Sequence, residues 1–476
     1  MITLKQIDKT LDNQHLCVLY NELKEFSGIL RNEEETTYVR SLMEAKKDII
    51  VINQYSRFLF LIKKPAEENI PQKAEKLRKL GYGLQKLVEE YKISELQIEN
   101  NTPSTANILD LVEGLYLSAY QFTRYKTDKK KNVLKTVMVC DFSLEKSQLK
   151  QLNHVLEGVC IARDLVNEPL SYLTAEQLSD DIEKLGKEAG FGVEVMNKSK
   201  IKSLKMGGLL AVNEGSPNPP TFNVLEYKPK NAVNKLPFVL VGKGVVYDTG
   251  GYSLKPADSL DWMKCDMAGA AAVVGAFYAI AQNKLPIYLV GLIPATENKL
   301  AGDSIVPGDV IEMYNGKTVE VVNTDAEGRL ILADALAYAS KFKPLLTIDL
   351  ATLTGSAARA IGKEGIVYMG TAPDEIKIEF EKSGLHVHER LVEFPLWEEY
   401  DEQLKSNIAD YKNLGDSPEA GAIMGGKFLQ QFTDYPWLHL DIAGGAYLKT
   451  VDNYRGKNGT GVGVRLLYRY LKSLIK

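Results

Sequence analysis

The chain has 476 residues, of which 45% are hydrophobic and 25% are charged. This composition is typical of a globular protein and excludes a disordered or a membrane chain. The 58 basic and 62 acidic side chains give a formal charge of -4, which offers no overall attraction for nucleic acid or anionic lipid.

The first part of the chain predicts an ordinary α/β scaffold. Short β-branched and aromatic runs predict strands near Leu16, Ile50 and Leu59, and leucines at helical spacing predict a helix over 74–91. The basic run 125–135 is interpreted as a solvated loop, because no aromatic interleaving accompanies it. A further strand is expected at TVMVCD, and then a long helix over residues 147–166. That helix could join two domains.

The rest of the chain predicts a second, larger α/β domain. Continuous apolar strands that alternate with helices indicate a sheet buried on both faces with largely parallel crossover connections. Only four of the 37 glycines precede residue 150, which indicates that the two regions do different work. We therefore expect a smaller N-terminal α/β domain, 1–150, and a larger C-terminal α/β/α domain, 151–476, with a mostly parallel mixed sheet. The runs that carry this prediction are 237–241, 268–282, 286–294, 319–322, 330–340, 345–350 and 365–370.

Cysteine and histidine spacing does not support the common zinc sites. The four cysteines form no C-x-x-C pair, and the five histidines form no H-E-x-x-H arrangement. A metal site would therefore depend mainly on oxygen ligands. The start of the chain has no apolar segment of signal-peptide length, and we find no run of about 18 apolar residues elsewhere. We expect a cytoplasmic protein without a membrane partner.

Three glycine-rich or acidic junctions carry the candidate chemistry: 241–256, 263–272 and NTDAEGRL at 323–330. The last stands between an apolar strand run and an apolar helical run, and open α/β sheets bind ligands where strands end. Four carboxylates gathered in one cleft would repel one another strongly unless cations neutralised them, and divalent metals would do so. The polar residues of these junctions are Lys243, Asp248, Lys255, Asp266, Asp325, Glu327 and Arg329.

Each acid also has a structural interpretation. Asp248 could set a turn, Asp266 could cap the alanine-rich helix, and Asp325 and Glu327 could cap the next helix or favour its dipole. These roles do not explain why Lys243 and Lys255 flank Asp248 in a glycine-dense loop, where glycine indicates close approach of the backbone to a bound group. A phosphate-binding P-loop is rejected, because its spacing is absent.

With these segments in view, the chain resembles the leucyl (cytosol) aminopeptidase family, which are two-metal exopeptidases. The resemblance rests on VGKGVVYDTGGYSLKP, MKCDMAGAA and especially NTDAEGRL, and it covers about residues 155–476. Segments 419–429 and 441–448 depart from the family pattern, which bears on substrate preference. Further matching segments are 162–169, 347–355, 408–413, 437–444 and 461–467.

The resemblance implies a di-metal centre with assigned ligands. Asp248 and Glu327 would bridge two ions, Lys243 and Asp266 would complete one shell, and Asp325 would complete the other. Lys243 would bind as a neutral amine, because a neighbouring dication disfavours its protonated form. The ions would be Zn or Mn, with Mg or Co also compatible.

The resemblance also implies a reaction. The chain would hydrolyse the N-terminal peptide bond of peptides, with preference for leucine or other hydrophobic first residues, through a water that bridges the two ions. Lys255 would stabilise the oxyanion, and Arg329 would hold a bicarbonate that relays a proton. The pocket for the substrate side chain would include Met263, Thr352, Gly355 and Ala443.

Three other hypotheses remain open. Some family members bind DNA as assembly proteins, although the acidic balance argues against nucleic acid here. A catalytically silent scaffold conflicts with the intact set of seven polar residues. A narrower task, such as cysteinylglycine hydrolysis, is compatible with the same site. The family further implies a homo-oligomer, a hexamer, with the first 150 residues in an assembly or access-controlling role.

Overall fold

The computed structural model describes residues 2–22, 28–67, 69–102, 104–129 and 132–475, and these form two compact units. The first unit extends from the N-terminus to Leu156, and the second takes most of the remainder. Two later segments, His386–His388 and Val451–Gly456, belong to the first unit. The Tyr454 hydroxyl, for example, donates to Glu75 Oε2 at 2.6 Å. A single cut at residue 150 therefore omits two short segments that pack with the first unit.

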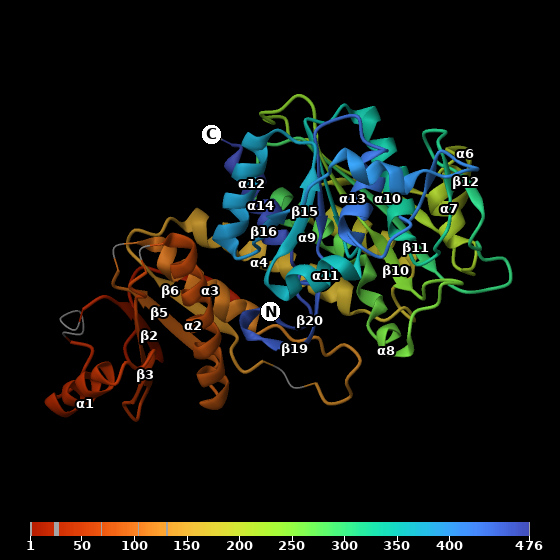
Figure 1. Cartoon of the computed structure of the whole chain (residues 1–476). Coiled ribbons are helices and arrows are strands. Elements are labelled where there is room, and N and C mark those ends of the chain that lie inside the picture. The colour runs from red at the N-terminus through yellow and green to blue at the C-terminus, as the bar shows by residue number, and fades with distance from the viewer. Residues whose placement is uncertain (1, 23–27, 68, 103, 130–131, 476) are drawn as a thin grey trace. The chain divides into compact units, whose positions relative to one another are not determined.

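The first unit contains a six-stranded sheet in the order β1-β6-β5-β2-β4-β3. Figure 1 labels four of its strands, β2, β3, β5 and β6. All neighbouring strands are parallel except β3 and β4, which are antiparallel. Continuous burial of β2 and most of β4 is expected for strands that helices cover on both faces. The strands are Thr3–Ile7 (β1), Leu16–Tyr20 (β2), Ile49–Asn53 (β3), Phe58–Lys63 (β4), Glu95–Asn100 (β5) and Thr136–Cys140 (β6).

Two helices of the first unit, α1 and α2, begin with asparagine caps. Asn32 and Asn69 accept hydrogen bonds from the backbone amides of Glu35 and Gln72, which satisfies groups that a helix start leaves without partners. Helix α4 runs from the first unit into the second, and it corresponds to the long helix predicted over 147–166 that could join two domains. The helices are Glu33–Glu44 (α1), Ile70–Glu90 (α2), Thr105–Ser118 (α3) and Lys146–Asn167 (α4).

The second unit contains a nine-stranded mixed sheet in the order β16-β15-β18-β14-β9-β11-β8-β7, with β10 beside β11. Its centre, β18-β14-β9-β11, is parallel, and antiparallel pairs stand nearer the edges. The predicted mostly parallel mixed sheet is confirmed. Its strands are Gly192–Met196 (β7), Thr221–Tyr227 (β8), Phe238–Gly242 (β9), Gly244–Asp248 (β10), Leu289–Asn298 (β11), Leu346–Ala351 (β14), Ile366–Gly370 (β15), Leu391–Glu393 (β16) and Trp437–Asp441 (β18).

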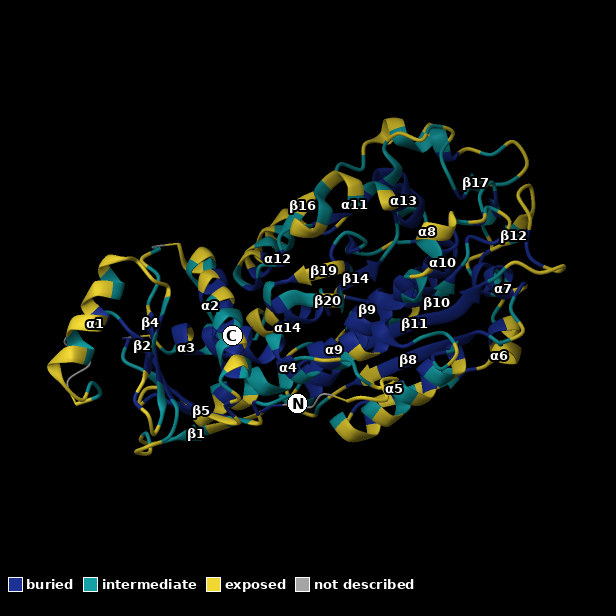
Figure 2. Cartoon of the chain, turned by 90° about the horizontal axis from the view of Figure 1, so that it is seen from below, coloured by how far each residue is buried: buried dark blue, intermediate teal, exposed yellow. Residues whose placement is uncertain are grey.

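Helices cover both faces of this sheet, so the unit has three α/β/α layers. Val239 and Val241 of β9 pack in one core with residues of α7, α10 and α13, while α9 contacts β9 and β14 together with α5 and α14. Figure 2 shows β8, β9, β11 and α9 almost wholly buried. The longer helices are Ala175–Ala189 (α5), Gly207–Asn213 (α7), Ala268–Gln282 (α9), Gly328–Ala339 (α10), Gly355–Ile361 (α11), Asp374–Val387 (α12), Gly421–Gln430 (α13) and Val464–Ser473 (α14).

The remaining elements are short. Two small sheets lie outside the main one: β12-β13-β17 and β19-β20. The short elements are Lys198–Ser203 (α6), Ala257–Leu260 (α8), Met263–Met267 (η2), Val310–Glu312 (β12), Thr318–Glu320 (β13), Ser340–Phe342 (η3), Gly362–Glu364 (η4), Glu398–Leu404 (η5), Tyr411–Lys412 (β17), Tyr447–Asp452 (β19), Asn453–Arg455 (η6) and Gly456–Gly459 (β20).

One sequence-based expectation needs correction. The run 319–322 is not a strand of the main sheet, because β13 ends at Glu320 and pairs only with β12 and β17. The stretch Met263–Gln282 is long and apolar enough to cross a membrane by length and composition, although Lys264 and Asp266 interrupt its apolar residues. Its small residues make it apolar, and 94% of the qualifying window is buried inside the structure. The core helix of a soluble protein passes the same test, so this is weak support for a membrane span.

Close approach of backbones fixes the centre of the second unit. A Cβ on Gly269, in the first turn of α9, would lie 2.0 Å from the Leu350 carbonyl oxygen and 3.0 Å from the Lys243 amide nitrogen. A Cβ on Gly242 would lie 2.6 Å from the Cα of Ala270. Glycine at both positions therefore lets α9 touch the ends of β9 and β14.

We predict that Gly269→Ala lowers the free energy of unfolding by about 1–3 kcal/mol, because the added methyl must push backbone away from backbone. Denaturant unfolding followed by tryptophan fluorescence measures this loss. Gly302→Ala is the matched control, since a Cβ there meets nothing within 4 Å. Equal stability of the two variants would contradict the packing argument.

Candidate metal centre

Asp248 is the last residue of β10 and begins the glycine-rich loop. Its Oδ1 accepts hydrogen bonds from the Gly250 amide at 2.9 Å and from Asn298 Nδ2 at 2.8 Å. Both glycines of this loop, Gly250 and Gly251, have positive φ angles of 86° and 62°, which few side chains tolerate. The turn role expected for Asp248 is therefore real, yet its Oδ2 still faces the cluster described below.

The segment NTDAEGRL packs directly against that loop. The Thr324 hydroxyl donates to the Gly250 carbonyl oxygen at 2.6 Å and accepts from the Ser253 amide at 2.8 Å. Asp325 follows in a turn, and Glu327 stands immediately before α10 without capping it through its side chain. Asp325 and Glu327 therefore face the glycine-rich loop from an irregular turn at the start of α10.

Lys243 and Asp266 complete the inner side of the cluster. Lys243 follows β9, and Asp266 lies in η2, before α9; both are almost fully buried. The Lys243 Nζ lies 2.8 Å from carboxylate oxygens of Asp266 and 2.8 Å from Glu327 Oε1. It also donates to the Thr352 carbonyl oxygen at 3.1 Å. The structure thus brings together residues from three separate parts of the sequence.

Lys255 lies on the more open side. Its Nζ is 2.7 Å from Asp248 Oδ2 and 2.5 Å from Asp325 Oδ1, and its side chain is 15% exposed. The ammonium group therefore occupies the space between two carboxylates. That position shows that the pair offers a site for a positive charge.

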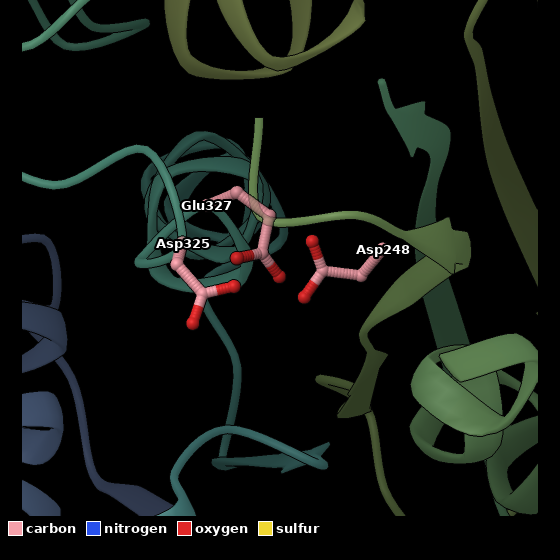
Figure 3. Close-up of side chains that lie close together, drawn as sticks. All are labelled: Asp248, Asp325 and Glu327. Atoms are coloured by element: carbon pink, nitrogen blue, oxygen red, sulfur yellow. The ribbon is translucent and has the colours of Figure 1, made fainter. Parts of the chain in front are cut away.

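The three carboxylates Asp248, Asp325 and Glu327 point toward one another (Figure 3). One ligand oxygen from each lies within 4.8 Å of the others, which is a spacing that can hold a metal ion. Asp266 Oδ2, Asp325 Oδ1 and Glu327 Oε1 are buried and make no hydrogen bond of normal geometry, although each is within ion-pair distance of a lysine. These oxygens keep lone pairs available, so the donor set fits divalent cations.

Burial and mutual repulsion disturb the protonation of the cluster. Burial and the charge of Glu327 raise the pKa of Asp248 to about 7, and burial raises the pKa of Asp266 well above its ordinary range. Burial lowers the pKa of Lys243, but Asp266 and Glu327 outweigh this effect and raise it overall. Four carboxylates against the two lysines leave a formal charge of -2, which a bound cation would offset.

Arg329 is buried in the first turn of α10. Its Nη1 donates to the Asn413 carbonyl oxygen at 2.7 Å, while its Nε has no hydrogen-bond partner among the described residues. Burial lowers the pKa of Arg329 to about 10, against the opposing effect of Glu327. The guanidinium therefore retains a donor that an anion could use.

The structure brings only some of the residues predicted for the substrate pocket to the acidic cluster. The Thr352 hydroxyl donates to Asp266 Oδ1 at 2.7 Å, which places Thr352 at the cluster. Asp441 Oδ1 accepts from the amides of Leu353 and Ala443 at 3.1 and 3.2 Å, so Ala443 lies beside the same loop. Met263 begins η2, and Gly355 begins α11 at an exposed position.

Supporting residues escaped prediction from the sequence. Asn298 donates a hydrogen bond to Asp248, and Thr324 donates one to Gly250 of the glycine-rich loop. Buried Asp441 accepts a hydrogen bond from Thr354 in the segment after β14. Asp441 lies in 437–444, a segment that matches the family, and Thr324 lies inside NTDAEGRL. Asn298 has no such signal, because only its place at the end of β11 brings it to the cluster.

Comparisons with known proteins agree with this geometry. The catalytic domain of the cytosol aminopeptidase family matches residues 160–468. A probable cytosol aminopeptidase of Syntrophotalea carbinolica is 45% identical over 379 residues, covering 78% of this chain and 76% of that protein. One of Chlorobium limicola is 46% identical over 377 residues, covering 76% and 74%.

Solved structures give the same result across nearly the whole chain. The bottromycin maturation enzyme BotP in complex with Mn has a TM-score of 0.86 and 28% identity, covering 98% of this chain and 100% of BotP. A mutant of tomato leucine aminopeptidase has a TM-score of 0.86 and 28% identity, covering 99% and 97%. This chain therefore belongs to the cytosol aminopeptidase family and is a metal-dependent hydrolase of the leucyl aminopeptidase type.

Proposed function

We propose that Lys243, Asp248, Asp266, Asp325 and Glu327 hold two divalent ions that serve the release of N-terminal residues from peptides. Asp248 and Glu327 would contact both ions, Lys243 and Asp266 one ion, and Asp325 the other. The observation that carries this proposal is the approach of Asp248, Asp325 and Glu327 ligand atoms to within 4.8 Å, with Asp248 and Glu327 buried and Asp325 partly exposed. A set rich in carboxylate oxygens suits Zn or Mn, with Mg or Co also compatible. The manganese in BotP supports Mn.

In the proposed reaction, the ions and two side chains, Lys255 and Arg329, would have different roles. When bound, two divalent ions would supply a shared water of lowered pKa and neutralise developing negative charge. Lys255, which is partly exposed beside Asp248 and Asp325, would donate to the oxygen of the attacked carbonyl. Arg329 would hold bicarbonate as a proton relay through its available Nε, because a permanently charged guanidinium cannot itself act as a base.

Substrate choice would depend on the wall beside the cluster. We assign Met263, Thr352, Gly355 and Ala443 to the pocket for the first side chain, with leucine or another hydrophobic residue preferred. The contact of Thr352 with Asp266 supports this assignment. A narrower preference, such as cysteinylglycine, would use the same centre.

The assembly is proposed from the family alone. We expect a hexamer located in the cytoplasm, with the first unit controlling assembly or access. The description of the relatives as cytosol aminopeptidases supports the location.

Removing the metal should abolish release of leucine from leucine amide, and Mn²⁺ or Zn²⁺ should restore it. Asp325→Ala should not recover with either ion, because it removes a proposed ligand. A panel of leucyl, arginyl and cysteinyl substrates on the same sample would establish preference. Full activity of the metal-free protein would exclude the proposed mechanism.

Replacing Lys255 by Gln should lower kcat by about 100- to 1000-fold with little change in KM, because the lost charge acts on the transition state. Steady-state kinetics and metal content are measured on the same preparation. Exposed Lys202→Gln is the control. A large rise in KM at unchanged kcat would instead assign Lys255 to substrate binding.

Gly328→Ala should weaken metal binding, because a Cβ at Gly328 would lie 2.3 Å from Cε and 2.6 Å from Nζ of Lys243. The lysine amine must then leave its place beside Asp266 and Glu327. Metal content after dialysis, compared with Gly302→Ala, measures the effect. Normal metal content and activity would show that the Lys243 amine is not needed as a ligand.

A further inference from the structure

A second candidate site lies within the first unit. A cavity of about 650 Å³ is lined by residues at the ends of β2 and β4, in the turn after α1, and on α2. Tyr20 ends β2 and Lys63 ends β4. This volume falls within the usual range for pockets that bind small molecules.

The cavity lies where the connections that follow two neighbouring strands, β2 and β4, begin. Strands β2 and β4 are parallel neighbours, and each is followed by a helix. Helix α1 packs through Val39 with Val18 and Leu61, on one face of the sheet. A Cβ on Gly83 of α2 would lie 3.1 Å from Ile49 Cδ1.

Those contacts place α1 and α2 on opposite faces. Ile50 belongs to the same buried cluster as Val39 of α1. Successive side chains of a strand point to opposite faces, so Ile49 lies on the face of the sheet opposite α1. The chain therefore leaves two adjacent parallel strands toward opposite faces. Open α/β sheets bind ligands outside the carboxyl ends of strands at such a switch point.

The cavity is strongly basic, although the whole chain is slightly acidic. Among the residues that the structure describes, its lining contains six lysines and two acids, Asp48 and Glu67, which together carry a formal charge of +4. Lys76 pairs with Glu67, and Lys79 lies 3.5 Å from Glu75. The remaining lysines have no acidic partner in the part of the chain that the structure describes: Lys46, Lys47, Lys63 and Lys64.

The lining also has an apolar part. Met43, Pro65 and Leu80 line the cavity together with buried Tyr20. Lysine ammonium groups bind phosphate as mobile point charges, and a phosphate monoester carries about -1.5 to -2 at neutral pH. Two phosphates would thus match the excess charge, and an apolar or aromatic body would match the rest of the lining.

We infer that the first unit binds a small molecule that carries two or more phosphate groups on an apolar or aromatic body, at the switch point between β2 and β4. The concave shape favours a small molecule over a nucleic-acid strand, which needs an extended groove. This inference is independent of the metal centre and of the aminopeptidase activity.

Isothermal titration of the full chain with ADP tests the inference. ADP should bind, the affinity should fall as salt rises from about 0.05 M to about 0.5 M, and adenosine should not bind measurably. The double variant Lys63→Gln/Lys64→Gln should weaken ADP binding at least about fivefold. The matched double variant Lys146→Gln/Lys150→Gln, two exposed lysines of α4 outside the cavity, should bind ADP as the native chain does.

A third variant separates this site from the metal centre. Asp325→Asn should retain ADP binding, because Asp325 does not line the cavity. Absence of ADP binding, equal loss in both lysine variants, or loss in Asp325→Asn would each overturn the inference. Displacement of ADP by duplex DNA with tighter binding of the DNA would also overturn it, since the lysines would then contact nucleic acid.

Discussion

The catalytic unit depends on gathering like charges in a buried place. Contacts with Lys243 and Lys255 hold four carboxylates close together: Asp248, Asp266, Asp325 and Glu327. The negative charge that these lysines leave unbalanced favours the binding of cations. Carboxylates that repel one another stay together only where the surrounding structure fixes them. Rigid packing of the second unit is therefore a condition for its chemistry.

The sheet meets that condition by aligning strand ends. Lys243 follows β9, Asp248 ends β10, Asn298 ends β11, Thr352 follows β14 and Asp441 ends β18. These strands run parallel to one another in the sheet, so their carboxyl ends meet along one edge. Groups far apart in the sequence thus converge without long loops. Glycines at the same edge permit the close contacts, as Gly328 does beside Lys243.

The same principle operates in the first unit with opposite charge. Its cavity also lies at strand ends, but lysines line it instead of acids. A basic pocket and an acidic metal cluster on separate sheets would select different ligands. One chain could thereby respond to a phosphorylated molecule as well as to peptides.

Local pattern in the sequence determined much of the architecture. Apolar runs predicted β2, β9, β14 and α9, because buried strands and helices must be apolar whatever surrounds them. The segment NTDAEGRL and its companion segments indicated the family, and the roles proposed for the polar residues of the acidic cluster follow from that resemblance. These local patterns did not predict which side chains are buried, how the strands pair, or how closely Lys243 approaches Gly328.

Tertiary structure alone decided how these pieces meet. The run 319–322 was predicted as a strand of the larger domain, yet only its first two residues lie in a strand, β13, which belongs to a small separate sheet, since strand pairing depends on partners distant in the chain. Asn298 became a support of Asp248 only through the position of β11. The lysine-lined cavity likewise combines residues from four segments that share no motif. The sequence determines the local preference for helix or strand and the chemistry of each side chain. The distances between groups that are remote in the sequence are set only when the chain packs.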